Sequence, residues 1–280
     1  MNVAGKKALI TGASSGIGAG LAVTFARAGA TVGICARRTD RLEAVLDECR
    51  VHAPESRAWT IDLSDLDGVA AFAAQADDEL GGIDILVNNA GIPKRRHVLE
   101  LSADVVDEVM AINYASPVRL TLALLPRMVA RGGGAIVTIS SVAARLGPPR
   151  EAAYSATKAA ISAFMESAAV DLDGANIAIH LVNPGIIQTE LFDLPDNEPS
   201  LSDLEALPVS ALADAVLAQL ESGTFEIYVP DWFADITPAR YGDVGAFIEG
   251  SKQWVRQRLA GASTADTAAA LDALVAEQGG

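Results

Sequence analysis

The chain has 280 residues, of which 50% are hydrophobic and 20% charged, and its formal net charge is −15. So acidic a balance argues against a nucleic-acid-binding protein, because binding to phosphates requires positive charge. The two cysteines, Cys35 and Cys49, lack C-x-x-C spacing and are expected to be reduced thiols. Since a signal-peptide pattern and an apolar stretch of about 18 residues are both missing, we expect a soluble, cytoplasmic protein.

The first part of the chain predicts a strand, a glycine-rich turn and a helix. A short apolar run at Lys7–Thr11 precedes a helical pattern at 17–28, and the turn between them is Gly12, Ala13, Ser14, Ser15, Gly16, Ile17, Gly18. Glycine lets the backbone approach a ligand closely, and the free N–H groups at a helix start bind anions. The glycine spacing, without the Lys-Ser/Thr pair of a P-loop, favours a dinucleotide over a magnesium-bound triphosphate.

The alternation of strands and helices continues through the first half of the chain. Strands are expected at 30–36, 57–62 and 83–88, with helices at 41–51 and 66–80. This order predicts a parallel sheet with helices on both faces. All its strands then end at the same edge, where ligands of such sheets bind.

Residues at that edge indicate which dinucleotide binds. Arg37 and Arg38 follow the second strand, where an acidic residue would hold a ribose 2′-hydroxyl. Because guanidinium groups fit a 2′-phosphate, we predict NADP(H), with NAD(H) as the alternative. Other contacts are expected after the third and fourth strands, from Asp62 and Leu63 at the adenine and from Asn89, Ala90 and Gly91 along the cofactor.

A second constellation lies further along, at Tyr154 and Lys158. Residues four apart on a helix share one face, so both side chains can act on one point. A phenol ordinarily ionises near pH 10, and a neighbouring ammonium lowers its pKa while burial opposes that effect. The hypothesis is that Tyr154 is a general acid/base near neutral pH. Ser140 and Ser141, at the end of a strand expected at 135–140, offer a hydroxyl for the same site.

Together these motifs resemble those of the short-chain dehydrogenase/reductase family, of the compact single-domain type. They are Thr11-Gly-x-x-x-Gly-x-Gly18, Asn88-Asn-Ala-Gly91, Asn113, Ser141, Tyr154-x-x-x-Lys158 and Pro184-Gly185, in family order over residues 6 to about 190. The resemblance implies one Rossmann-like domain over 1–260, with a doubly wound, mainly parallel seven-stranded sheet. It also implies an NADP(H)-dependent oxidoreductase that interconverts a carbonyl group and a secondary alcohol.

The resemblance further implies roles for single residues. The spacing to Tyr154 makes Ser141 rather than Ser140 the catalytic serine. Asn113 would kink its helix and hold a water joined to Lys158, which would bind the nicotinamide ribose. Pro184, Gly185, Ile187 and Thr189 would line the nicotinamide end of the cofactor. A homodimer or homotetramer through 104–131 and 152–172 is implied, and the unusual chain ending leaves the choice open.

The substrate side is less determined by the sequence. An irregular segment with several leucines predicts a lid at 186–210 and a hydrophobic substrate. The basic run 94–97 either attracts a carboxylate or phosphate or forms a solvated loop. A helical extension at 230–260, with an amphipathic pattern from Val244 to Leu259, would cover the pocket, join a subunit or complete the core. An Ala-rich tail follows at 261–280, and the scattered His52, His97 and His180 indicate no metal site.

A second reading of the sequence is a non-catalytic NAD(P)-sensing regulatory protein of the same fold. Sensing does not require Ser141, Tyr154 and Lys158 together, so their presence favours the enzyme. A sugar-nucleotide epimerase could reuse the Tyr/Lys pair, but the glycine spacing and the modest substrate segment disfavour it.

Overall fold

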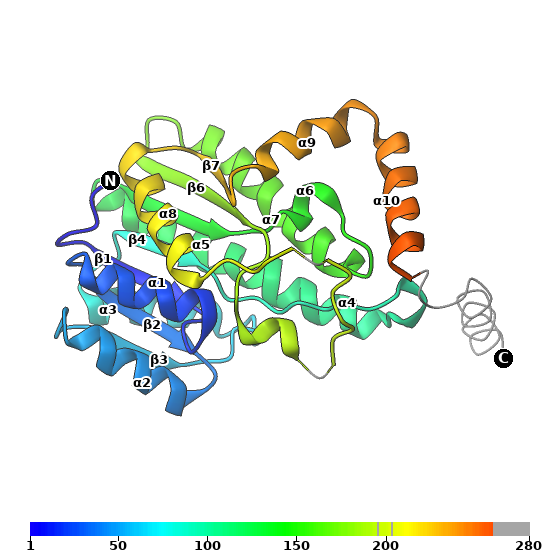
Figure 1. Cartoon of the computed structure of the whole chain (residues 1–280). Helices are drawn as coiled ribbons and strands as arrows, with labels where there is room; N and C mark the ends of the chain where they lie inside the picture. The colour runs from blue at the N-terminus through cyan, green and yellow to red at the C-terminus, as the bar shows by residue number, and fades with distance from the viewer. Residues whose placement is uncertain (195, 203, 260–280) are drawn as a thin grey trace.

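Parallel strands form the centre of the protein (Figure 1). The computed structural model describes residues 1–194, 196–202 and 204–259, so the tail predicted at 261–280 lies outside the described residues. Within the described part, the sheet has seven strands in the order β3-β2-β1-β4-β5-β6-β7, all parallel. The predicted doubly wound architecture is confirmed. The strands are β1 (Lys7–Thr11), β2 (Thr31–Ala36), β3 (Arg57–Thr60), β4 (Ile85–Asn88), β5 (Gly134–Ile139), β6 (Ile177–Pro184) and β7 (Glu226–Val229).

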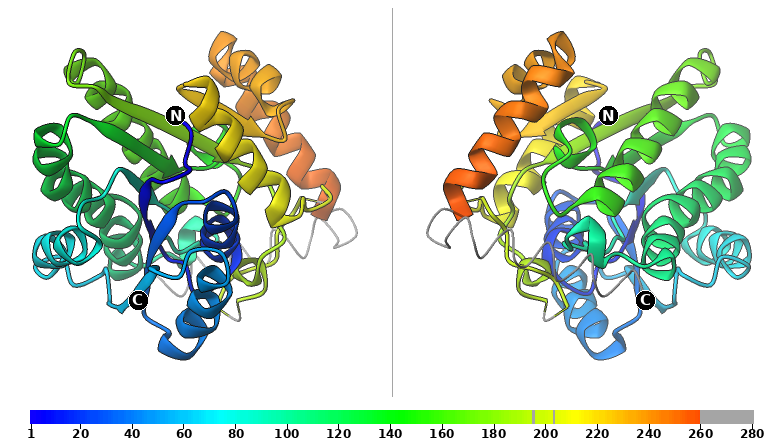
Figure 2. Two further views of the ribbon diagram at one scale, coloured as in Figure 1. Left: turned by 90° about the vertical axis from the view of Figure 1, so that its left-hand side faces the viewer. Right: turned by 90° about the vertical axis from the view of Figure 1, so that its right-hand side faces the viewer.

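Helices cover both faces of the sheet, as Figure 2 shows from two sides. One layer contains α1 (Gly16–Arg27), α2 (Thr39–Arg50) and α8 (Val209–Ser222). The other contains α3 (Val69–Leu80), α4 (Ala103–Met110), α5 (Ser116–Ala130) and α7 (Ala152–Asp171). Alternate residues of a strand point to opposite faces, so Ile10 packs into the first core and Leu9 into the second. Strands buried on both faces explain the continuous apolar runs of the sequence.

The carboxyl ends of the strands lie along one edge of the sheet. The order reverses between β1 and β4, because β2 and β3 lie on one side of β1 and the later strands on the other. Ligands of open parallel sheets bind at such a switch point. Thr11 and Asn88 therefore end β1 and β4 at the place where a site is expected, and the Ser140-Ser141 pair directly follows β5 there.

The chain after β6 builds a cover over this edge. It contains the 3₁₀ turn η3 (Glu190–Asp193) and a bridge between Ile187 and Leu207 at the base of the lid. After β7, the chain forms α9 (Phe233–Gly242) and α10 (Val244–Leu259). Both helices lie within the helical extension predicted at 230–260, and the predicted amphipathic pattern from Val244 to Leu259 coincides with α10. Within the described residues, no helix combines enough length and apolar character to cross a bilayer.

Candidate active site

The glycine-rich turn packs directly on the end of β4. A Cβ atom at Gly12 would lie 2.7 Å from the Cα atom of Ala90, and one at Gly18 would lie 2.5 Å from Asn89 Nδ2. Gly12 also has a φ of +68°, a value that favours glycine. Asn89 holds the two strand ends together, because its Nδ2 donates to the Thr11 carbonyl at 2.8 Å. The turn after β1 and the segment after β4 thus form one rigid floor.

The arginines predicted for the 2′-phosphate lie in different surroundings. Arg38 donates to the hydroxyl of Ser14 at 3.1 Å and to that of Ser15 at 2.6 Å, so it lies against the glycine-rich turn. Arg37 is exposed and contributes its charge to Asp62, which helps to lower the pKa of that carboxyl; the main cause is a backbone hydrogen bond from Ser64. Leu63 is buried beside β3.

Further along the edge, Pro184 ends β6 and Gly185 follows it. A Cβ atom at Gly185 would lie 2.5 Å from a ring carbon of Phe233, so the C-terminal extension packs directly on this turn. Ile187 is buried. Thr189 packs against the glycine-rich turn, because a Cβ atom at Gly16 would lie 3.0 Å from its Cγ2 atom.

Ser141, Tyr154 and Lys158 come together at the carboxyl end of β5. The Ser141 hydroxyl interacts with that of Tyr154 and lowers its pKa, and the Lys158 Nζ atom lies 5.6 Å from the centre of the tyrosine ring. Lys158 donates to the Ile139 carbonyl at 2.8 Å. Ser140 instead turns toward α7, where its hydroxyl lies 2.8 Å from that of Ser162. The geometry therefore favours Ser141 over Ser140 as the partner of Tyr154.

Burial is the largest influence on the pKa of Tyr154 and of Lys158. It raises the pKa of Tyr154, as does the charge of Glu151, while the Ser141 hydrogen bond lowers it. Burial also lowers the pKa of Lys158 to about 8. In this geometry desolvation penalises the charged forms of both groups and opposes the lowering of the phenol pKa expected from Lys158. The role of Tyr154 as a general acid/base near neutral pH stays a prediction.

Asn113 lies in a π-helical turn, η2 (Ala111–Ala115), between α4 and α5. Such turns interrupt regular helices and recur at functional sites. Its Nδ2 donates to the Ile92 carbonyl at 3.0 Å and to Thr157 Oγ1 at 3.1 Å, and its Oδ1 accepts from the Ile92 N–H at 2.8 Å. Asn113 thereby fixes the segment after Gly91 against α7. The water path implied for it stays a prediction.

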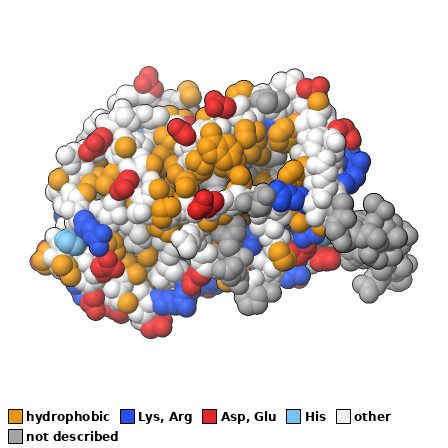
Figure 3. Space-filling model, viewed as in Figure 1, with side chains coloured by type: hydrophobic (Ala, Val, Ile, Leu, Met, Phe, Trp, Pro, Cys, Tyr) orange, Lys and Arg blue, Asp and Glu red, His pale blue; other side chains and the backbone are white. Residues whose placement is uncertain are grey.

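A cavity of about 330 Å³ opens in front of the trio. Its walls come from the segment after β4, the region around the short helix α6 (Ala143–Leu146), the lid and α10. Hydrophobic side chains dominate the wall and include Ile92, Leu146, Ile186, Leu191, Leu201, Leu204, Phe233, Phe247 and Trp254. The C-terminal helix α10 therefore contributes to the wall of the pocket through Phe247 and Trp254. Figure 3 shows that hydrophobic side chains also gather on the outer surface between α8 and α9.

The basic run 94–97 holds the lid in place. Lys94 forms an ion pair with Asp196, and the Arg96 guanidinium donates to the Asp196 carbonyl at 2.9 Å. Arg95 Nε donates to the Glu198 carbonyl at 2.9 Å. The run is thus neither a free solvated loop nor a bare anion site, although Arg95 also lines the cavity.

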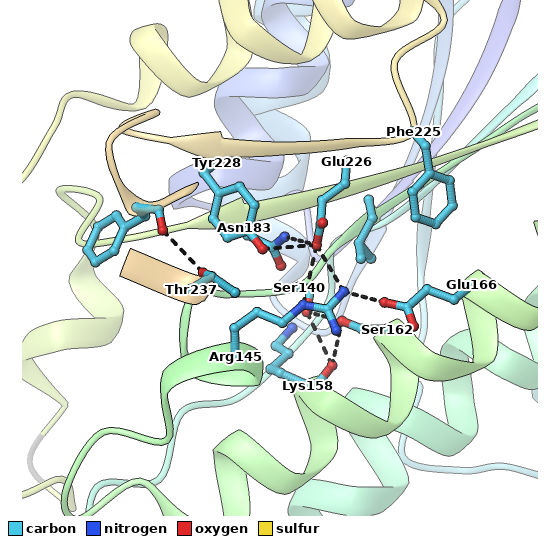
Figure 4. A network of polar contacts seen from close by, with 12 residues as sticks. Ser140, Arg145, Lys158, Ser162, Glu166, Asn183, Phe225, Glu226, Tyr228 and Thr237 are labelled. Atoms are coloured by element: carbon cyan, nitrogen blue, oxygen red, sulfur yellow. Dashed lines mark hydrogen bonds and ion pairs between the residues drawn. The ribbon is translucent and has the colours of Figure 1, made fainter. Parts of the chain in front are cut away.

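A polar network behind the cavity joins α6, α7, β6 and β7 (Figure 4). The guanidinium of Arg145 forms ion pairs with Glu166 and, at 2.9 Å, with Glu226. Glu226 also accepts from Asn183 Nδ2 at 2.7 Å. Since α6 follows Ser141 and α7 carries Tyr154, the network keeps the two hydroxyl-bearing elements in register.

Sequence reasoning missed three residues of this edge. Glu151 faces the cavity with Tyr154, and Arg41 and Glu190 form an ion pair with N···O 2.5 Å beside Arg38. For Arg41 a signal existed, because it follows Arg38 by one helical turn and shares its face. The sequence holds no comparable signal for Glu190 or Glu151, since their positions depend on how the lid and α7 are placed.

Comparisons with known proteins agree with this fold. The chain matches the model of the short chain dehydrogenase family over residues 6–198, and it belongs to that family. The Drosophila melanogaster dehydrogenase/reductase SDR family protein 7-like is 43% identical over 193 residues, which cover 67% of this chain and 59% of that protein. An uncharacterized oxidoreductase of Mycobacterium tuberculosis is 37% identical over 224 residues, covering 77% of this chain and 65% of that protein.

A solved structure gives the same result for the architecture. The short-chain dehydrogenase from Sphingobium yanoikuyae, in complex with NADPH, superposes with a TM-score of 0.74 at 29% identity, covering 90% of this chain and 95% of that one. The chain spans only about 60% of the length of several curated relatives that it matches.

Proposed function

We propose that this chain is an NADP(H)-dependent oxidoreductase that interconverts a carbonyl group and a secondary alcohol on a hydrophobic substrate. The observation that carries the proposal is the meeting of Ser141, Tyr154 and Lys158 on the wall of an apolar cavity beside the glycine-rich edge. A sensor of NAD(P) would need the edge and not the trio, so the non-catalytic alternative is disfavoured.

The residues of the edge fit a nicotinamide dinucleotide. The carboxylate of Glu190 lies among Ser15, Arg38 and Arg41, so this part of the edge accommodates an anionic group. When bound, the cofactor supplies or accepts the hydride, and the protein supplies position and electrostatics. The residues proposed to hold it are Gly12, Ser14, Ser15, Gly16, Ile17, Gly18, Arg37, Arg38, Asp62, Leu63, Asn89, Ala90, Gly91, Tyr154, Lys158, Pro184, Gly185, Ile187 and Thr189.

The chain's own residues handle the substrate oxygen. The hydroxyls of Ser141 and Tyr154 donate hydrogen bonds to it and stabilise the negative charge that grows there during reduction. Tyr154 then transfers its Oη proton to that oxygen, and in oxidation it takes the proton back. The ammonium of Lys158 stabilises the phenolate that remains, while Asn113 positions Ile92 and thereby the adjoining cavity wall.

The cavity limits the substrate to a small or medium-sized apolar ketone or alcohol. A volume of about 330 Å³ lies at the lower end of the range of ligand pockets. Relatives of this chain share the fold and one was solved with NADPH, which supports the choice of cofactor class.

Assembly of copies is also part of the proposal. Exposed hydrophobic side chains lie on α5 and α7, at Leu122, Val129 and Val170. Apolar groups on one surface favour a contact between subunits, so we expect a homodimer or homotetramer through these helices. Light scattering of the purified protein measures its mass directly, and a monomer at micromolar concentration would contradict this expectation.

One experiment tests the function. NADPH fluorescence is titrated with the protein, and NADPH consumption is then followed with a panel of aliphatic, cyclic and aromatic ketones. Saturable binding together with turnover of at least one apolar ketone is expected. Saturable binding without turnover across the panel would favour the sensor instead.

A further inference from the structure

A carboxylate from the lid lies in the anion site at the end of β2. Glu190 Oε1 accepts from Ser15 Oγ at 2.7 Å and pairs with Arg38 Nη1 at 2.6 Å, while Oε2 pairs with Arg41 Nη1 at 2.5 Å. These contacts hold the pKa of Glu190 at about 2, and the hydrogen bond from Ser15 is the largest cause. One carboxylate thus collects three donors from two different elements.

The donors belong to the part of the edge that serves the adenosine ribose. Ser15 is the N-cap of α1, Arg38 is the N-cap of α2, and Arg41 lies one turn further along α2. In folds of this type the residues after the second strand contact the ribose 2′ position. Two guanidinium groups, a hydroxyl and a helix N-terminus together match a phosphate monoester.

A phosphate and the carboxylate cannot share these donors. Both are anionic, so a 2′-phosphate that enters the site must displace Glu190. A ribose 2′-hydroxyl carries no charge, and it can donate a hydrogen bond to a carboxylate. The same side chain therefore opposes one cofactor and is compatible with the other.

We propose that Glu190 determines cofactor selectivity, because it competes with the 2′-phosphate of NADP(H) for Ser15, Arg38 and Arg41 and leaves NAD(H) unopposed. The inference rests on the proposed function, since it requires a nicotinamide dinucleotide at this edge. It also adds Arg41 to the residues that bind the 2′-phosphate.

The position of Glu190 links this competition to the lid. Thr189 packs against Gly16, Glu190 begins η3, and Leu191 lines the cavity. Displacement of the Glu190 carboxylate by a 2′-phosphate therefore acts on the same short segment that forms a wall of the substrate cavity. Binding of NADP(H), and not of NAD(H), releases this end of the lid.

The size of the effect follows from the exposure of the groups. Side chains of Arg38, Arg41 and Glu190 are 43%, 48% and 38% exposed, and single exposed ion pairs contribute little. Three donors that bind one carboxylate together contribute more binding free energy than one such ion pair. We expect their combined loss to change NADPH affinity by about tenfold.

The test is a set of dissociation constants for NADPH and NADH, measured by fluorescence titration. Glu190→Gln keeps the shape of the side chain and removes its charge, so it should tighten NADPH binding about tenfold and leave NADH binding unchanged or slightly weaker. Asp196→Asn is the matched control, because Asp196 lies in the same lid and pairs with Lys94 away from the anion site. It should leave the ratio of the two constants at the wild-type value.

A second variant approaches the site from the donor side. Arg41→Met should weaken NADPH binding and spare NADH, and circular dichroism of each variant verifies that it is folded. The selectivity role would be overturned if Glu190→Gln left the NADPH dissociation constant unchanged, or if it increased the affinity for NADPH and NADH equally. Either result would leave the proposed function intact. Failure of the wild type and all variants to bind either cofactor would overturn the proposed function itself, and the inference with it.

Discussion

At the scale of single residues, the site depends on a phenol that is hard to ionise. Burial raises the pKa of Tyr154, and Glu151, one helical turn before it, raises it further. The pKa of Glu151 is itself raised to about 7, mainly by burial, so its negative charge develops above neutral pH. A protonated tyrosine serves reduction over a wide pH range, whereas oxidation requires the phenolate and should accelerate as the pH rises.

The first prediction concerns this pair. In Glu151→Gln the phenol loses a neighbouring negative charge and ionises at lower pH, so the alkaline rise of oxidative kcat/KM should move to lower pH. At pH 8.5 we expect roughly a fivefold gain over the wild type. Glu48→Gln is the control, because Glu48 pairs with Arg27 at the surface. An unshifted profile in Glu151→Gln would remove Glu151 from the electrostatics of the site.

The sequence predicted which residues meet at this site better than how they ionise. Tyr154 and Lys158 are found from helical spacing alone, because an i, i+4 pair shares a face wherever the helix lies. The balance between the Lys158 ammonium and burial in setting the tyrosine pKa depends on packing, which a sequence does not contain. The Glu190 contact joins residues 149 to 175 positions apart, and no local pattern encodes it.

At the scale of elements, close packing of α1 against α8 positions the glycine-rich turn. A Cβ atom at Gly20 would lie 2.2 Å from Val209 Cγ1, a distance that requires atoms to shift. Intrinsic helix propensity favours alanine over glycine by about 1 kcal/mol. Overpacking of a core ordinarily costs about 1–3 kcal/mol, so the steric effect outweighs propensity at this position.

The second prediction follows from that balance. Gly20→Ala should lower the free energy of unfolding by about 1–2 kcal/mol, measured by urea denaturation. Gly250→Ala in α10 is the matched control, since a Cβ atom there meets open space. It should raise stability by up to about 1 kcal/mol. Stabilisation by both substitutions would contradict the packing argument.

Element boundaries show where pattern reading succeeds and where it ends. The strands predicted at 30–36 and 83–88 appear as β2 and β4, shortened by one or two residues at their starts. The apolar sequence runs are longer than the hydrogen-bonded strands, because residues just before each strand, such as Ala30 and Ile83, are buried as well. By contrast, the helix predicted at 66–80 begins only at Val69, since Leu66 to Gly68 form the turn that precedes α3.

At the scale of the whole molecule, the cavity brings together segments that are distant in sequence. Residues from the segment after β4, from the lid and from α10 line the same space. The alternation of strands and helices was enough to predict the edge on which they meet. The chemistry of the cavity was harder to foresee, because lid and α10 follow no pattern that fixes their placement.

The third prediction tests the role of α10 as a wall. Trp254 lines the cavity, so Trp254→Ala should raise KM for an apolar ketone about tenfold with a smaller change in kcat, as expected when ground-state binding surface is lost. Tyr241→Ala is the control, because Tyr241 is 57% exposed and lies in the preceding helix. Unchanged KM in Trp254→Ala would show that α10 does not contact the substrate.

The central claim is that Tyr154 exchanges the proton with the substrate oxygen. Its most direct test is Tyr154→Phe, in which NADPH affinity and the rate of ketone reduction are measured on the same preparation. The NADPH dissociation constant should stay within about twofold of the wild type, while kcat should fall by about 100-fold to 10,000-fold, the usual contribution of a general acid. Reduction at a rate within about tenfold of the wild type would contradict the account, since a phenylalanine has no proton to give.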